Sequence, residues 1–189
     1  SGLRQLAGGS DEIQTPEGIP FKTPGDTNQN NISFVSLWDN YPNEITMPLH
    51  GNAQHVYLLM AGSTNPMQSH FTNGLITITY TDGSTQTLLL RNPENWWPIE
   101  QDFYIDHYAF KTGVPKPPRV HLKTGWIGTG FRDYTSIKGF TNYAVEGGAA
   151  TVIDMPLNPE KELRSLKLEA VANDVVLGLM AVTLEQSNK

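Results

Sequence analysis

The chain has no cysteine among its 189 residues, and this absence excludes several kinds of chemistry at once. Without thiolates there is no disulfide framework, no cysteine nucleophile, no zinc–thiolate site and no iron–sulfur cluster. No run of 18 apolar residues occurs either, so the sequence predicts no membrane span. With 38% hydrophobic and 10% aromatic residues, the chain still has enough apolar material for one sizeable core.

Basic residues are scarce in the first 110 positions. That stretch holds three Lys or Arg against eleven Asp or Glu, and the whole chain has a formal charge of −6. Nucleic-acid binders usually carry a strongly basic face, so we predict no nucleic-acid partner. Residues 111–138 differ, because six basic residues there accompany only one acidic residue. Interleaved with aromatic residues, they could grip an anionic polymer; the alternative is a solvated loop.

Helical periodicity is also missing. No window of 12 residues shows a 3.6-residue period, and the one helix candidate is a turn at 159–163. Short alternating or apolar runs recur instead, separated by glycine and proline, and Asp82-Gly83 between two of them indicates a β-hairpin. This pattern predicts an all-β protein, an antiparallel β-sandwich or jelly roll. The expected strands are 32–38, 44–49, 56–60, 75–80, 85–90, 103–110, 149–155, 166–172 and 175–184.

The composition divides the chain into two parts. Residues 1–17 are mostly small and polar, which predicts an N-terminal linker or loose arm. Residues 18–189 are expected to form a single β-sandwich domain. The chain starts Ser1-Gly2-Leu3-Arg4 without a signal-peptide pattern, and we interpret it as a piece of a larger protein.

Several short motifs follow one another in a recognisable order. They are Gly18-Ile19-Pro20-Phe21, Tyr80-x-Asp82-Gly83, Asn95-x-Trp97 and Leu157-x-Pro159-x-Lys161-x-Leu163. Over 18–189 the chain resembles galactose-binding-domain-like β-sandwich modules, which are often appended to polysaccharide-degrading enzymes of Bacteroidetes. The resemblance implies an exported, periplasmic or cell-surface module without catalytic activity. It implies a polysaccharide or oligosaccharide ligand, or a structural role in packing against a neighbouring catalytic domain. Many such modules also carry a structural calcium ion.

Sugar binding needs flat aromatic faces and polar groups that reach hydroxyls. Trp96 and Trp97 lie in a polar loop with Asp102. Adjacent residues of an extended chain point in opposite directions, so we expect one indole at most to face a ligand; the alternative is that both pack beneath the loop. Trp126 lies in a glycine-flanked loop, with Arg132 and Tyr134 as polar partners. A third possibility is Trp38, at the end of an expected strand.

Metal and catalytic signals are weaker. Calcium prefers oxygen ligands grouped in one loop, and the candidates are Asp26, Asn28 and Asp39. The sequence indicates no other cofactor. No HExxH motif and no GxSxG elbow occur, so we predict no catalytic residues. A small glycosidase or lyase remains an alternative, which requires two convergent carboxylates, or a base with a cation, in one cleft.

Overall fold

Strands make up nearly all of the regular structure, as the sequence predicts. The computed structural model describes residues 2–26, 28–65, 68–100, 113–128, 145 and 147–186. Within these residues there is one helix, α1 (Gly2–Ala7), and no helix long and apolar enough to cross a membrane. The strands are β1 (Glu12–Gln14), β2 (Pro20–Lys22), β3 (Ser33–Ser36), β4 (Glu44–Pro48), β5 (Ala53–Thr64), β6 (Thr72–Tyr80), β7 (Thr85–Arg91), β8 (Arg119–His121), β9 (Ile127–Gly128), β10 (Ala149–Pro156), β11 (Leu163–Ala170) and β12 (Val175–Gln186).

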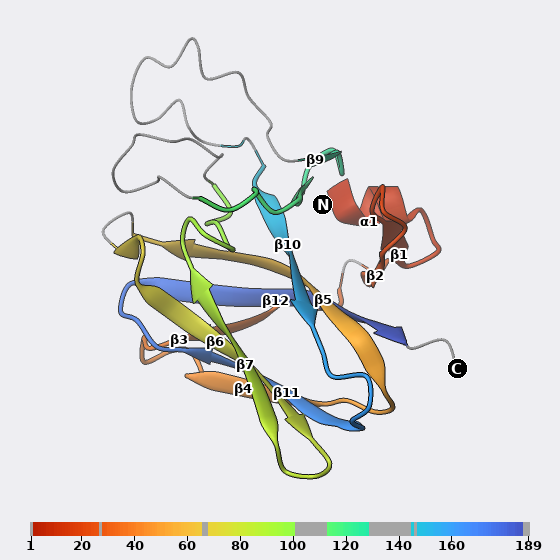
Figure 1. Cartoon of the computed structure of the whole chain (residues 1–189). Coiled ribbons are helices and arrows are strands. Elements are labelled where there is room, and N and C mark those ends of the chain that lie inside the picture. Colours follow the sequence, from red (N-terminus) through yellow and green to blue (C-terminus); the bar gives the residue numbers. More distant parts are fainter. Residues whose placement is uncertain are drawn as a thin grey trace.

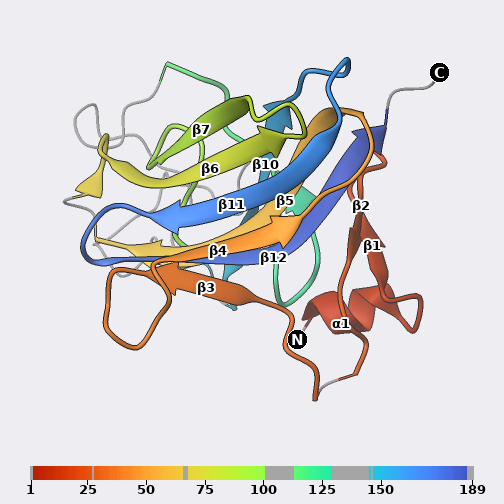
Figure 2. The ribbon, with the colours of Figure 1, turned by 90° about the horizontal axis from the view of Figure 1, so that it is seen from below.

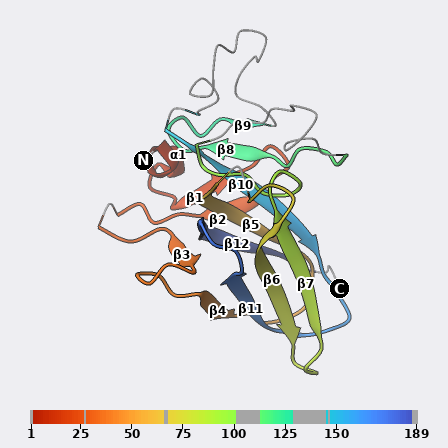
Figure 3. The same cartoon turned by 90° about the vertical axis from the view of Figure 1, so that its left-hand side faces the viewer.

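Two antiparallel sheets pack face to face as a β-sandwich (Figures 1 and 2). In the described residues, one sheet has the order β3-β12-β5-β10-β8-β9 and the other β4-β11-β6-β7. A separate hairpin of β1 and β2 lies with α1 beside the larger sheet (Figure 3). The fold class predicted from the sequence is therefore confirmed at the level of an all-β antiparallel sandwich.

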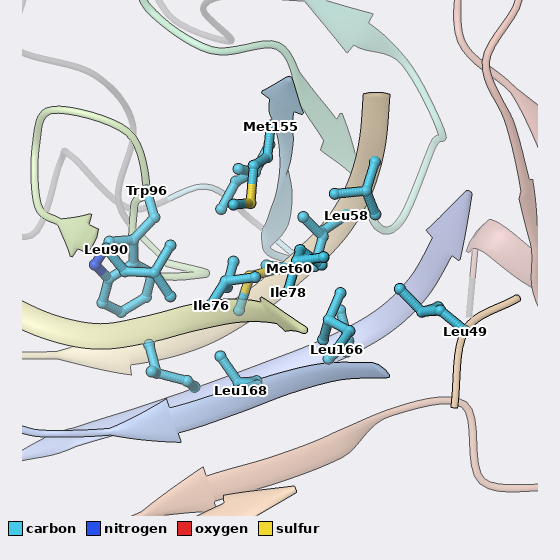
Figure 4. Close-up of a cluster of buried hydrophobic side chains, with 14 of the residues drawn as sticks. Leu49, Leu58, Met60, Ile76, Ile78, Leu90, Trp96, Met155, Leu166 and Leu168 are labelled. Atoms are coloured by element: carbon cyan, nitrogen blue, oxygen red, sulfur yellow. The ribbon is translucent and has the colours of Figure 1, made fainter. Parts of the chain in front are cut away.

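The main core fills the space between the two sheets (Figure 4). It follows from the pleat, because alternate residues of a strand point to the same face. Leu58 and Met60 of β5 face Ile76 and Ile78 of β6 across this layer, and all four are buried. The alternation in 75–80 thus marks a strand with one buried face, as expected.

The predicted hairpin joins β6 to β7. Gly83 has φ +84°, a value that glycine adopts without steric cost. The Ser84 backbone N–H donates to the Asp82 carboxylate at 2.8 Å. Lys161 lies 2.8 Å from the same carboxylate and lowers the pKa of Asp82, together with the hydrogen bonds from Ser84. The segment 159–163 forms a turn and not a helix. The ion pair between Lys161 and Asp82 ties it to this hairpin.

A second core covers the outer face of the larger sheet. Leu59 and Ala61 of β5 point away from the sandwich interior and are buried beneath the N-terminal residues. Leu3 of α1 and Phe21 of β2 supply much of this cover. The expected continuous apolar run at 56–60 is thus buried on both faces, as predicted.

The N-terminal arm is packed onto the sheet, which the sequence prediction did not include. Leu3 and Ala7 are four residues apart, and this spacing places both on one face of a helix. Gly2 sits so close to Lys123 that a Cβ at this position would overlap the Lys123 carbonyl group. The physical reason for the packing is the apolar outer face of β5, which needs a cover. The expected strand at 103–110 lies outside the described residues.

We expect Leu58→Ala to lower the free energy of unfolding by about 2–5 kcal/mol, because it leaves a cavity in the main core. Leu58 is 0% exposed, whereas Leu89, on the outer face of β7, is 40% exposed. Leu89→Ala is the matched control and should cost less than about 1 kcal/mol. Urea unfolding of both variants measures the difference. Equal losses would contradict this placement of the core.

Candidate functional site

A group of polar and aromatic side chains lies on the outer face of the larger sheet, where the arm's cover ends. His55 and Tyr57 come from β5, Asp154 from β10, and Glu185 from β12. In the register, Asp154 is opposite Tyr57 and Glu185 is opposite His55. Cross-strand partners share a face of the sheet, so the pairing brings these four side chains together. We call them the polar cluster.

Two short hydrogen bonds hold the polar cluster. His55 Nδ1 lies 2.7 Å from Asp154 Oδ1, and the Tyr57 hydroxyl donates to Glu185 Oε2 at 2.8 Å. A carboxylate only accepts hydrogen bonds, so the proton between His55 and Asp154 sits on Nδ1. The two rings are stacked, with centroids 5.8 Å apart and planes 9° from parallel. Each ring is therefore fixed by a carboxylate and by its neighbour.

A pocket of about 370 Å³ opens beside Tyr57. Its sheet wall comprises Tyr57 and residues 183–185, and its other wall is formed by residues 17–20, which lead from the N-terminal arm into β2. The arm wall is held by the Thr183 hydroxyl, which donates to the Pro20 carbonyl. Figure 2 shows β2 lying beside the ends of β5 and β12. We call this space the arm pocket.

The arm wall bends sharply just before β2. Gly18 has φ +83°, which glycine accepts readily, and its N–H donates to the Thr15 carbonyl at 2.9 Å. The Thr15 hydroxyl accepts from the Ile19 N–H at 3.1 Å. This turn places Glu17 in the lining of the arm pocket.

The arm pocket is acidic. Glu17 and Glu185 line it, and none of its lining residues within the described chain is Lys, Arg or His. Burial raises the pKa of Tyr57 to about 12, with a further contribution from its hydrogen bond to Glu185 and from nearby negative charge. Tyr57 therefore stays a neutral hydrogen-bond donor at any ordinary pH. The arrangement offers a ring, two carboxylates and an aliphatic wall to a small polar ligand.

The structure buries the first pair of sequence candidates. Trp96 and Trp97 are each 1% exposed, so neither indole faces a ligand and both serve the fold. The Trp96 indole N–H donates to the Asn73 side chain at 2.9 Å, and that of Trp97 to the Pro93 carbonyl at 3.1 Å. The loop turns at Asn95, whose N–H donates to the Arg91 carbonyl at 3.0 Å, and it is bonded to β5 through the Ile99 N–H and the Gly62 carbonyl at 2.7 Å. The expectation of opposite directions assumed an extended chain.

The other tryptophans are half exposed. Trp126 is 52% exposed, and its indole lies over the Cα of Gly128. Its predicted polar partners Arg132 and Tyr134 lie outside the described residues, as does Asp102. Trp38 is 47% exposed.

Trp38 belongs to an exposed aromatic patch at the edge of the larger sheet. The rings of Trp38 and Tyr41 have centroids 6.4 Å apart, and those of Phe34 and Tyr41 6.2 Å apart. Leu37, next to Trp38 in the chain, is also exposed. We call Phe34, Leu37, Trp38 and Tyr41 the edge patch.

The calcium candidates are divided between two loops. Asp26 uses its side chain to accept from the Asn28 N–H at 2.8 Å, an ordinary Asx turn. Asp39 is exposed beside Trp38, in the loop after β3. Within the described chain, no three His, Asp or Glu side chains gather as metal ligands do.

The basic stretch at 111–138 does not present all of its charges to solvent. Arg119 is fully buried, and its guanidinium donates to the carbonyls of Pro98 and Ala149 at 2.9 and 3.0 Å. It therefore contributes to the fold and cannot contact a polymer. Lys111, Arg132 and Lys138 lie outside the described residues.

Sequence reasoning missed the polar cluster. The available signal was a polar side chain at every second position of otherwise apolar strands: His55 and Tyr57 around Val56, and Asp154 within 149–155. Such spacing marks one face of a strand. Only the strand order shows that these faces are neighbours.

Comparisons of the chain with protein-family models, with curated proteins and with solved structures found no match.

The raised pKa of Tyr57 gives a direct test of this site. In an absorbance titration, the difference between the wild type and Tyr57→Phe should be one phenol that ionises near pH 12. Because the folded pKa exceeds the unfolded value of about 10, the stability that this group contributes is complete below pH 10 and falls as the pH rises to 12. Glu185→Gln should shift the ionisation to lower pH, since it removes the negative charge. If the phenol that the difference assigns to Tyr57 titrates near 10, the result contradicts the geometry.

Proposed function

We propose that the chain is a non-catalytic carbohydrate-binding module, of the galactose-binding-domain-like jelly-roll kind, in an exported bacterial glycan-degrading protein. The proposal rests on the resemblance of residues 18–189 to galactose-binding-domain-like modules and on the all-β sandwich of the structure. The ligand is a sugar unit of a polysaccharide or oligosaccharide, and the arm pocket is its site.

One observation carries this proposal: an aromatic ring and two carboxylates line the same small pocket. The ring of Tyr57 offers an apolar face to the C–H groups of a sugar. Carboxylates are the strong acceptors that sugar hydroxyls need, and each has about four acceptor positions. Glu185 therefore still has acceptor capacity after its bond to Tyr57.

The pocket is also rigid before any ligand arrives. Tyr57 is stacked on His55 and bonded to Glu185, and His55 is bonded to Asp154. Side chains that are already ordered lose little conformational entropy on binding. Such preorganisation favours a binding site on a sheet over one on an isolated exposed side chain.

The edge patch favours a second function, that of an interaction module. Phe34, Leu37 and Trp38 are exposed together on β3, the edge strand of the larger sheet, and in the loop that follows it. An exposed group of large apolar side chains indicates a protein contact. Here the partner is a neighbouring catalytic domain in the same protein.

We expect Tyr57→Ala to weaken binding of the recognised oligosaccharide about tenfold or more, because it removes both the ring and the hydrogen-bonded hydroxyl. Glu185→Gln keeps the shape and should weaken binding less. Trp38→Ala, which alters the edge patch, is the control and should bind as the wild type does. The measurement is calorimetric titration with gluco-, galacto-, manno- and chito-oligosaccharides, with thermal unfolding to confirm that each variant is folded.

Two results contradict the proposal. One is that the wild-type chain binds neither the oligosaccharides of the panel nor any insoluble polysaccharide. The other is release of reducing sugar by the chain that is lost in Glu17→Gln or Glu185→Gln, which would make the pocket catalytic.

The interaction function makes a separate prediction at Trp38. The difference in fluorescence between the wild type and Trp38→Phe gives the signal of Trp38. Quenching of this signal by acrylamide should fall when the chain is part of its full-length protein. A docked domain shields the indole that is 47% exposed in this chain. Equal quenching in both settings excludes docking through the edge patch. The quenching of Trp126, obtained in the same way from Trp126→Phe, serves as the control for a tryptophan outside the edge patch.

A further inference from the structure

Among the described residues, the lining of the arm pocket has two carboxylates and no basic side chain, and this restricts the kind of sugar that fits it. From this charge and the ring beside it, we infer that the sugar bound in the arm pocket carries a protonated amino group, as in a glycan with free hexosamine units. The inference rests on the proposed function and narrows its ligand class.

The charges around the pocket support this. Glu17 lines one wall and Glu185 the opposite wall. Asp154 adds a third carboxylate on the far side of the stacked rings, where it is bonded to His55. An ammonium group donates three hydrogen bonds and accepts none, which matches a pocket whose charged groups only accept.

Several basic residues of the described chain are bonded to groups outside the arm pocket. Lys161 pairs with Asp82, and Lys167 with Glu44 and Glu169, all in the smaller sheet and its turns. Arg4 donates to the Gln29 carbonyl. Lys22, on the strand that follows the arm wall, lies opposite Glu12 in the β1–β2 register and is not part of the pocket lining.

The Tyr57 ring favours the same ligand. A cation beside an aromatic ring is attracted by the negative charge of its face. The Tyr57 hydroxyl donates to Glu185, which holds that carboxylate beside the ring. A glycan with carboxylate or sulfate groups would meet repulsion from Glu17 and Glu185, so the pocket selects against acidic glycans.

A matched pair of ligands tests the inference. Glucosamine oligomers of two or three units are compared with their N-acetylated counterparts, which have the same backbone and lack the positive charge. We expect the free amine to bind the intact chain at least tenfold more tightly at a pH where it is protonated. The preference should disappear as the pH rises through the pKa of the amine, a range in which Tyr57 stays protonated because its pKa is about 12.

Variants separate the pocket from the general charge of the protein. The chain has a net charge of −6, which attracts any cation weakly, so short oligomers are used. Glu17→Gln and Glu185→Gln should each reduce the preference several-fold, and the double variant should abolish it. Glu160 is an exposed carboxylate in the turn between β10 and β11. Glu160→Gln is therefore the matched control and should leave the preference for the amine unchanged.

The results distinguish this inference from the function on which it rests. Equal or tighter binding of the N-acetylated oligomer, or of neutral glucan or galactan oligomers, overturns the inference and leaves the carbohydrate-binding function standing. A preference for the amine that survives in the folded double variant also overturns it. Absence of binding to every oligosaccharide overturns both.

Discussion

Burial of strand β5 on both of its faces is the constraint on which the rest of the structure depends. Leu58 and Met60 are covered by the smaller sheet, as any sandwich strand is. Leu59 and Ala61 point the other way and need a second cover, because exposed apolar area of this kind costs about 25 cal/mol per Å². The N-terminal arm supplies that cover through Leu3 and its neighbours. The arm therefore belongs to the core, and its position follows from the sheet.

Where the arm's cover stops, β5 changes from apolar to polar on the same face. Tyr57 packs against the second core and also reaches the arm pocket, and His55 lies beyond it. Polar groups at such a boundary are costly unless they are hydrogen-bonded, and here each ring is matched with a carboxylate. The result is a polar site of fixed geometry next to the apolar part of the outer face that the arm covers.

The sequence predicted the sandwich because its strands are local patterns. Asp82-Gly83 specifies its hairpin by itself, and alternation at 75–80 shows which face is buried. The arm was harder to predict, because α1 is too short to show a helical period. Trp96 and Trp97 were uncertain for a different reason: their burial depends on the path of a loop. The polar cluster joins Tyr57 to Glu185, 128 positions apart, and a strand register over that separation is not contained in any local pattern.

The position of the arm would couple its docking to the proposed sugar binding. Because residues 17–20 form one wall of the pocket and the sheet forms the other, a ligand held between them binds the docked arm and not the detached one. Binding and docking must then strengthen each other by the same factor. Detachment of the arm would therefore act as a switch: the core between the two sheets would remain, while the pocket would lose the wall formed by residues 17–20.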